Sequence, residues 1–346
     1  MPYYLEKKPE FPEEPKQEMK TTEKRRKLLR LSLAVVFCLL IGYGGIRLIL
    51  YYSDLSASRE TGRELRQIRD QADSETASFV PAEAETGSPS PASAGQEPQN
   101  KETMLTDDGA LPPGQDQQRE ETELTSGGTD EDLLRPIPYP DNPKLEISEQ
   151  FRRLRKKSRY IIGWIRVDEM DEAVAQKDNT FFLNHDAMGK RNSNGAIFLD
   201  SDIRLLTRPY TFFLYGHNMK SGNMFGRLKK YKESAYFYRH RIISFDTMYE
   251  EGRYAVFSVM EMNTVPGTGL WYDLWALNSN SAVEREKAIR TLEKRSAVTS
   301  VLDVRADDQL LLLITCLDGE TERLVVAARR LRNDETEDRL TLRPDQ

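Results

Sequence analysis

The sequence predicts a mainly β protein domain, a closed barrel or sandwich of about eight strands, behind a membrane helix and a flexible linker. Short apolar runs recur after residue 140, with Gly, Asn and Asp between them. An uncharged apolar segment lies near the amino terminus, and a long polar stretch separates the two. We therefore divide the 346 residues into a basic tail (1–27), a transmembrane segment (28–52), a linker (53–140) and an outer domain (141–346).

The apolar segment is the first element. Residues 31–46 form a run of 16 uncharged residues, slightly shorter than the roughly 20 that cross a bilayer. Residues 28–52 are long enough if Arg30 and Arg47 reach the two interfaces. The basic run 24–27 predicts a cytoplasmic amino terminus and an extracytoplasmic outer domain, with the chain crossing the cell membrane once.

Two alternatives to this signal-anchor remain. Residues 55–57 loosely resemble a signal-peptidase site, so the segment could be a cleaved signal peptide. The segment could also be a buried helix of a soluble protein, which fits less well. We favour the uncleaved signal-anchor because the apolar segment begins late and runs long.

The linker is acidic. Residues 71–132 contain 15 Asp and Glu against 2 Lys and Arg, so the net charge of −6 belongs largely to this stretch. Such a composition buries too little apolar surface to offset the entropy of ordering, which predicts a flexible tether. Residues 59–69 mix both charge signs and could extend the membrane helix by a few turns. The rest of the chain has no basic cluster typical of nucleic-acid binding.

The outer domain begins with an amphipathic helix at 145–158, whose apolar stripe contains Ile147, Phe151 and Leu154. A second helix is expected at 283–295, between the sixth and seventh of the predicted strands. The runs with strand character are 159–167, 179–186, 195–200, 208–217, 241–247, 253–262, 308–316 and 323–331.

The chain has two cysteines and three histidines, which excludes a disulfide scaffold and a zinc site built on thiolates. No dense carboxylate loop has calcium spacing, so we predict no metal and no cofactor. Cys38 lies in the membrane segment and is expected to act as a small apolar residue. Cys316 is the single thiol of the outer domain. It is either a buried core residue at the end of a strand or a nucleophile.

The neighbours of Cys316 favour chemistry. If the last two strands pair as a hairpin, Cys316 and Arg323 become neighbours at its mouth, and a guanidinium stabilises a thiolate. Arg323 could equally be a rim charge facing an acidic residue of the turn, and Arg329 and Arg330 lie further along the strand.

A proton carrier would be a histidine. His217 follows a strand and precedes a loop, where functional residues often stand. His185 and His240 are rivals, and spacing alone does not choose among the three.

Several blocks of this sequence resemble the sortases, and class B in particular. The segment 215–231, YGHNMKSGNMFGRLKKY, resembles the block around the catalytic histidine of that family. The blocks 176–186 and 195–200 resemble those that precede it. LLITC at 312–316 and RLVVAAR at 323–329 resemble the strands of the nucleophile and of the essential arginine. The two predicted helices also fit class B, and the resemblance covers about residues 145–330.

The resemblance implies a sortase-type β-barrel and a membrane-anchored cysteine transpeptidase. Such an enzyme cleaves an Asn-Pro-x-Thr-Asn/Gly-like sorting motif after Thr, holds the surface protein as a thioester and passes it to an amine of peptidoglycan or a lipid-linked precursor. His217, Cys316 and Arg323 match the catalytic positions. The resemblance also assigns substrate binding to three positions, namely Asn179, Leu183 and Thr315.

The sequence departs from the family pattern in two places. Leu312 replaces the first threonine of Thr-Leu-x-Thr-Cys, and residues 171–175 lack the proline of a Tyr-Pro-Val stretch. Both changes concern substrate preference rather than the reaction. Two other functions remain open: a sortase that polymerises pilins with a pilin lysine as acceptor, and a non-catalytic tethered module that binds peptides.

Overall fold

The structure is a computed structural model that describes residues 16–78, 139–317, 321–333 and 335–337. The acidic stretch of the predicted linker from 79 to 138 lies outside these residues. The described helices are α1 (Lys16–Ser78), α2 (Glu149–Lys157), α3 (Ser234–Arg239) and α4 (Ala282–Lys294), with 3-10 turns η1 (Phe181–Leu183), η2 (Leu228–Lys232) and η3 (Leu274–Asn278). The strands are β1 (Ile161–Val167), β2 (Met170–Ala175), β3 (Ile197–Leu199), β4 (Thr211–Tyr215), β5 (Ile242–Thr247), β6 (Arg253–Asn263), β7 (Leu310–Cys316) and β8 (Glu322–Arg330).

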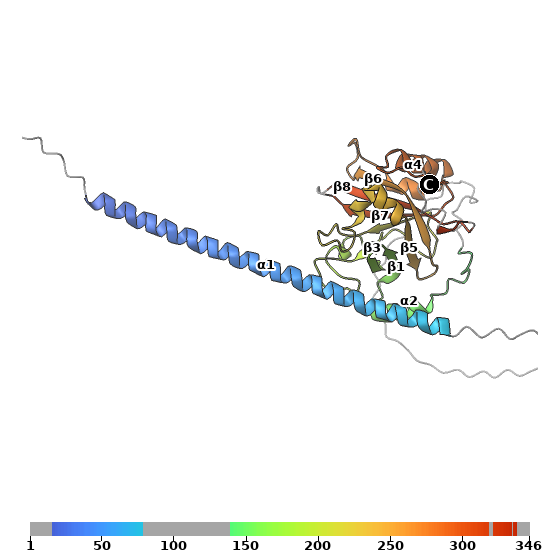
Figure 1. Cartoon of the computed structure of the whole chain (residues 1–346), viewed down its shortest axis with the longest axis horizontal. Helices are drawn as coiled ribbons and strands as arrows, with labels where there is room; N and C mark the ends of the chain where they lie inside the picture. Colours follow the sequence, from blue (N-terminus) through green and yellow to red (C-terminus); the bar gives the residue numbers. More distant parts are fainter. Residues whose placement is uncertain (1–15, 79–138, 318–320, 334, 338–346) are drawn as a thin grey trace, which may run out of the picture. The chain divides into compact units, whose positions relative to one another are not determined.

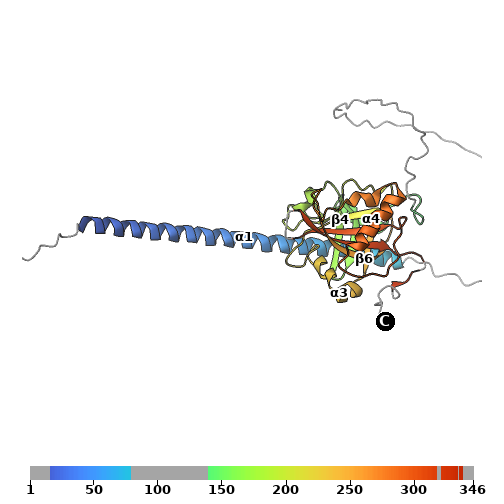
Figure 2. The ribbon, with the colours of Figure 1, turned by 90° about the horizontal axis from the view of Figure 1, so that it is seen from above.

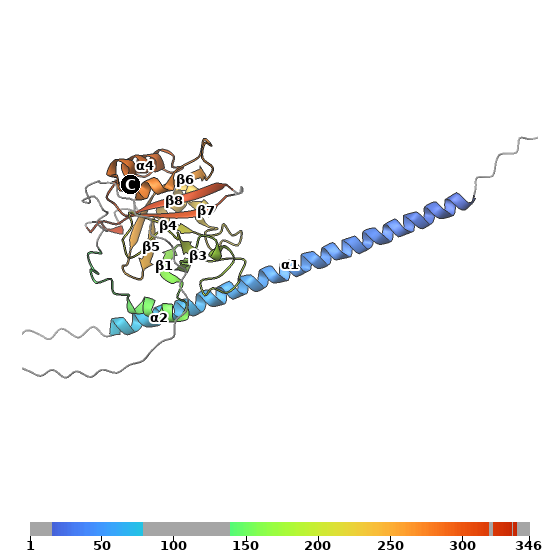
Figure 3. The same ribbon diagram turned by 180° about the vertical axis from the view of Figure 1, so that it is seen from behind.

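The eight strands close into a barrel in the order β1-β2-β3-β4-β7-β8-β6-β5, which confirms the predicted fold class (Figure 1). Six neighbouring pairs are antiparallel, whereas β2–β3 and β4–β7 are parallel. Figure 3 shows β6, β8 and β7 side by side. The parallel β4–β7 pair matters for function because it brings two strand ends, far apart in sequence, to the same edge.

The second strand differs from the sequence prediction. It is β2 rather than 179–186, because Val167 pairs with Met170 and leaves a two-residue hairpin loop in which Asp168 has a φ of 52°. Residues 179–186 contain the turn η1 instead. The carboxylate of Asp178 accepts hydrogen bonds from the backbone N–H groups of Thr180 and Phe181, which stabilises a turn over a strand there.

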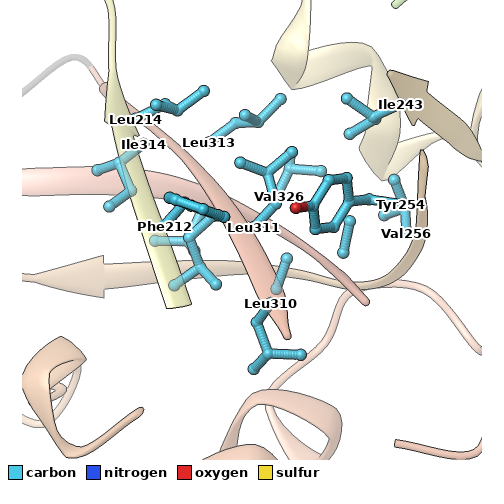
Figure 4. Close-up of a cluster of buried hydrophobic side chains, with 14 of the residues drawn as sticks. Phe212, Leu214, Ile243, Tyr254, Val256, Leu310, Leu311, Leu313, Ile314 and Val326 are labelled. Atoms are coloured by element: carbon cyan, nitrogen blue, oxygen red, sulfur yellow. The ribbon is translucent and has the colours of Figure 1, made fainter. Parts of the chain in front are cut away.

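The barrel core explains the apolar run of β7. The first six residues of this strand are buried, because the strand is covered on both faces. Phe212 and Leu214 of β4 lie in register with Leu311 and Leu313 of β7 (Figure 4). The predicted insertion between the sixth and seventh strands is α4, which lies beside β6 (Figure 2). Helix α2 is shorter than expected because Ser148 caps its first turn.

Helix α1 is 63 residues long, and one stretch of it is long and apolar enough to cross a membrane. The side chains of this stretch, including Cys38, are exposed. No other helix in the described ranges meets the same criteria of length and composition.

The part of α1 after residue 53 differs from the flexible linker expected there. Its buried and half-buried positions recur at alternating spacings of three and four residues, at 55, 58, 62, 65, 69 and 72, as on one face of a helix. Leu65 joins a buried cluster with Phe151 and Trp164. Residues 53–78 are therefore helical, a possibility that the sequence analysis raised for residues 59–69.

Polar contacts accompany that apolar packing. Arg69 forms an ion pair with Asp171, and its guanidinium lies 4.6 Å from the ring centre of Trp164. Asp54 accepts a hydrogen bond from the backbone N–H of Ser193 at 3.1 Å. These contacts give charged side chains of α1 polar partners in the outer domain.

Candidate active site

Cys316 is the last residue of β7 and the first exposed one after six buried positions. The buried strand fixes the backbone, and the thiol emerges at its end. The structure therefore excludes the alternative that Cys316 is a buried core residue.

Arg323 lies beside it. In the antiparallel β7–β8 pair, Cys316 and Arg323 are direct partners, so their side chains leave the same face of the sheet. On its other side Arg323 is paired with Met262 of β6. One guanidinium nitrogen donates to the backbone carbonyl of Glu322 at 2.9 Å.

The charge of Arg323 reaches the end of β4. Burial raises the pKa of Tyr215 well above its usual range, and the carboxylate of Asp200, which accepts a 2.9 Å hydrogen bond from the Tyr215 hydroxyl, raises it further. The Arg323 guanidinium acts in the opposite direction on the same pKa. The charge of Arg323 thus acts on Tyr215 at the end of β4.

His217 stands two residues beyond Tyr215, the last residue of β4. Tyr215 pairs in parallel with Ile314, which stands two residues before Cys316. Beyond this pair the strands stay joined, because the Gly216 N–H donates to the Ile314 carbonyl at 3.3 Å. His217 therefore follows the end of β4 at the same edge of the sheet where Cys316 ends β7.

A backbone carbonyl orients the imidazole of His217. The Nε2 atom lies 2.7 Å from the carbonyl oxygen of Leu183. Because a carbonyl only accepts hydrogen bonds, Nε2 carries the proton of this bond. The other ring nitrogen, Nδ1, is then the one that can take up or release a proton.

The two rival histidines have other contacts. His185 stacks on Phe181 with ring centres 4.0 Å apart, and its Nδ1 lies 2.9 Å from the Phe181 carbonyl. His240 ends α3 and lies 3.8 Å from the carboxylate of Asp168. Strand register brings His217, and neither of the others, to the ends of β4 and β7.

The three residues expected to bind substrate differ in their surroundings. Leu183 is 44% exposed, and its backbone carbonyl is hydrogen-bonded to His217. Asn179 is exposed, and its side chain accepts a hydrogen bond from the Ser201 N–H at 2.8 Å. Thr315 is only 3% exposed, and its hydroxyl donates to the Gly216 carbonyl at 2.7 Å. The buried Thr315 hydroxyl thus joins β7 to the residue before His217, and its role in substrate binding stays a prediction.

Two supporting features were missed by the sequence analysis. Gly195 has a φ of 64°, and a Cβ there would stand 3.0 Å from Cδ2 of His217 and 2.3 Å from the Phe182 carbonyl oxygen. The side chain of Asn263 donates to the hydroxyl of Thr321 at 3.0 Å, which joins the end of β6 to the loop before Arg323. For Gly195, the only sequence signal was the glycine itself, at the start of the block 195–200. No sequence signal indicated the bond between Asn263 and Thr321.

No group of three or more His, Cys, Asp or Glu side chains that could hold a metal ion occurs among the residues that the structure describes. The arrangement at the strand ends therefore consists of a thiol, an imidazole and a guanidinium. Together these groups can supply a nucleophile, a proton carrier and a fixed positive charge, as acyl transfer requires.

Known proteins resemble a large part of this chain. Residues 165–331 match the family model of the sortase domain. The chain is 26% identical to sortase B of Listeria monocytogenes over 52% of its own length and 74% of the relative's, and 27% identical to sortase B of Staphylococcus aureus over 53% and 75%. A crystal structure of a Bacillus anthracis protein described as similar to sortase B is 30% identical, with 55% of this chain and 86% of that chain covered and a TM-score of 0.49. Residues 165–331 therefore form a sortase domain, which indicates a sortase-type transpeptidase, and the chain is similar to sortase B.

Proposed function

We propose that this chain is a membrane-anchored cysteine transpeptidase in which Cys316 is the nucleophile, His217 the proton carrier and Arg323 the oxyanion-binding residue. One observation carries the proposal: an exposed thiol ends β7 with Arg323 as its direct partner on β8 and with the end of β4, which leads into His217, on its other side. Cys316 and Arg323 lie on strands of the barrel and His217 follows the end of a third, so little reorganisation is needed on binding.

In the first half-reaction, the Cys316 thiolate attacks the carbonyl carbon of the motif threonine. The carbonyl oxygen becomes an oxyanion, and Arg323, which remains protonated, stabilises it. When the tetrahedral intermediate collapses, the C–N bond breaks and the leaving amine takes a proton from the His217 imidazolium. The surface protein is then held as a thioester, and His217 is neutral.

In the second half-reaction, an acceptor amine attacks the thioester carbonyl. His217 accepts the proton that the amine loses, and the C–S bond breaks to release the thiolate and a new amide. The protonation state of His217 and the thiolate of Cys316 are both restored, so the cycle requires no cofactor.

The substrate is a surface protein with a carboxy-terminal motif like Asn-Pro-x-Thr-Asn/Gly. The similarity to sortase B supports this class of motif and an acceptor amine of peptidoglycan or its lipid-linked precursor. Leu183 would contact the motif, and two features support this role: its side chain is exposed, and its carbonyl accepts a hydrogen bond from His217. Asn179 would contribute less directly, through the turn that it stabilises.

The membrane arrangement is part of the proposal. The apolar stretch of α1 would span the membrane once with residues 1–27 in the cytoplasm, which places the barrel outside the cell. The catalytic domain would comprise the barrel and its helices from about residue 141, as expected from the sequence.

The proposal is tested by incubating the purified full chain with a library of sorting-motif peptides and a peptide amine. We expect cleavage after Thr for Asn-Pro-x-Thr-Asn/Gly peptides and ligation of the amino-terminal product to the amine. Peptides in which Thr is replaced serve as controls. Cleavage of unrelated peptides at equal rates, or no cleavage at all, would contradict the proposal.

A further inference from the structure

A second pocket lies away from the three reactive groups, between the segment 271–279 and helix α4. Its volume is about 570 Å³, within the range of pockets that bind small molecules. Its lining includes two exposed indole rings and three charged groups, those of Trp271, Trp275, Asp273, Glu284 and Lys287. Nothing in the proposed acyl transfer uses it.

Two indole rings stand half-exposed at this pocket. Trp271 is 43% and Trp275 42% exposed, which is unusual for the largest apolar side chain. Trp275 packs edge-to-face on the buried ring of Phe213, with ring centres 5.1 Å apart. This contact fixes the orientation of the Trp275 ring. Fixed, half-exposed aromatic faces are suited to bind a ligand with little loss of conformational entropy.

The backbone that carries these rings is also held firmly. Arg295 donates to the carbonyls of Leu270 at 2.8 Å and Trp271 at 3.2 Å. The hydroxyl of Tyr272 donates to the carbonyl of Ala288 on α4 at 3.0 Å. The segment and the helix therefore form one rigid wall rather than a loose loop.

The polar groups of the pocket indicate a neutral ligand with many hydroxyl groups. The lining includes the carboxylates of Asp273 and Glu284 and the ammonium of Lys287, a mixture of charges that favours neither a phosphate nor a simple cation. Each carboxylate already accepts one local hydrogen bond. Asp273 accepts from the backbone N–H of Trp275, and Glu284 accepts from the hydroxyl of Ser279. A carboxylate has further lone pairs, which can accept hydrogen bonds from hydroxyl groups of a ligand.

A saccharide has this combination of surfaces. The C–H face of a pyranose ring is apolar and carries partial positive charge, which suits the negative face of an indole, while its hydroxyls suit carboxylates. Peptides and lipids lack the dense ring of hydroxyl donors.

The location of the pocket connects it to the reactive groups. Trp271 forms a bridge with Asn263, which pairs with Glu322, and the next pair along is Met262 with Arg323, the partner of Cys316. The path from Trp271 to β6, from β6 to β8 and from β8 to Cys316 on β7 crosses three strand spacings. These correspond to about 15 Å between the backbones of Trp271 and Cys316. A peptide of four extended residues spans roughly 14 Å.

We infer that this pocket binds the glycan part of the acceptor, so that a peptide attached to the sugar delivers its amine to the thioester on Cys316. The inference rests on the proposed function, in which the acceptor belongs to peptidoglycan. The pocket then distinguishes a cell-wall acceptor from the lysine of a pilin, which carries no such sugar.

The test compares two acceptors with the full chain: a stem-peptide amine alone, and the same peptide attached to N-acetylglucosaminyl-N-acetylmuramic acid. We expect the KM of the wild type to be roughly 5- to 10-fold lower for the glycan-linked acceptor, as the loss of one aromatic contact implies. Trp271→Ala removes this difference but leaves hydrolysis of the sorting peptide unchanged. Val301→Ala, which truncates an exposed apolar residue outside the pocket lining, serves as the matched control.

A binding measurement without turnover makes the test independent of catalysis. The chain has 3 Trp, and Trp164 is only 1% exposed, so the disaccharide alone should change the fluorescence of the two pocket tryptophans. An unchanged spectrum, or an equal preference for the glycan-linked acceptor in Trp271→Ala, would overturn the inference. Failure of the wild type to cleave any sorting peptide would instead overturn the proposed function.

Discussion

Cys316 and Arg323 face each other as the last direct pair of the β7–β8 ladder. The hairpin that joins them fixes their relative position through seven consecutive pairs, and Met262 holds Arg323 from the other side. A guanidinium in this position is preorganised: it can stabilise negative charge that develops beside the sulfur without a prior rearrangement.

Arg323→Lys should lower kcat/KM for the sorting peptide by about 10²- to 10³-fold, because an ammonium does not reproduce the planar fork of the guanidinium. The thermal midpoint should change little, since the side chain is not buried. Steady-state kinetics checks the expectation, with Arg305→Lys, an exposed arginine paired with Asp303, as control. Turnover at the wild-type rate would remove Arg323 from the site.

Gly195→Ala should impair both stability and activity. The new methyl group would meet the Phe182 carbonyl and the ring of His217, and the backbone φ of 64° adds strain. We expect a loss of at least about 2 kcal/mol in the free energy of unfolding and a more than tenfold loss of kcat.

The matched control for this change is Gly267→Ala. Gly267 has a φ of 85° but open space around it, so it isolates the strain of the backbone from the clash. Denaturant unfolding and peptide cleavage are measured for both variants. Equal losses in the two would show that contact with His217 is unimportant.

Thr315→Val should reduce activity through the position of His217 rather than through substrate contact. The change keeps the shape of the side chain but leaves the Gly216 carbonyl without the hydroxyl at 2.7 Å, at a cost of about 1–2 kcal/mol. The account predicts a lower kcat with an unchanged KM for the sorting peptide. Thr299→Val, at an exposed position, is the control. A raised KM with normal kcat would favour direct binding by Thr315.

Glu172→Gln should change the pH dependence of stability. Burial raises the pKa of Glu172 to about 7, Arg66 at 3.7 Å opposes this, and Asp171 reinforces it. The folded protein therefore keeps a proton on Glu172 that the unfolded chain, with a pKa near 4.5, has lost. Since the native state binds more protons, the wild type should lose stability as the pH rises from about 4.5 to about 7.

The glutamine variant lacks this titration, so its curve should be flatter over that interval and lie above the wild-type curve at pH 8. Thermal midpoints measured from pH 4 to pH 8 test this, with the exposed Glu60→Gln as control. Parallel curves for wild type and Glu172→Gln would contradict the raised pKa.

Much of the barrel was predictable because its strands are short apolar runs between turn residues. The second strand escaped because MDEAVA contains acidic residues at half-buried positions, whereas the apolar run with Phe181 and Phe182 forms a turn. Burial in β2 depends on its partners β1 and β3, which local sequence does not reveal.

The sequence names candidate residues for the site but does not give their geometry. The choice of His217 over two rivals depends on the parallel β4–β7 register, which joins segments about a hundred residues apart. The sequence did not predict the packing of α1 after residue 53, for another reason. Its face combines Gly62, Leu65, Arg69 and Ala72, so small and charged residues replace the apolar stripe that sequence analysis seeks.

The most direct test of the account is the intact mass of the full chain during turnover of a sorting-motif peptide without an acceptor amine. The account predicts an adduct equal to the peptide acyl group on Cys316, which hydroxylamine releases, and its absence in Cys316→Ala together with loss of cleavage. An adduct on another residue, or continued cleavage by Cys316→Ala, would contradict the central claim that this thiol carries the acyl group.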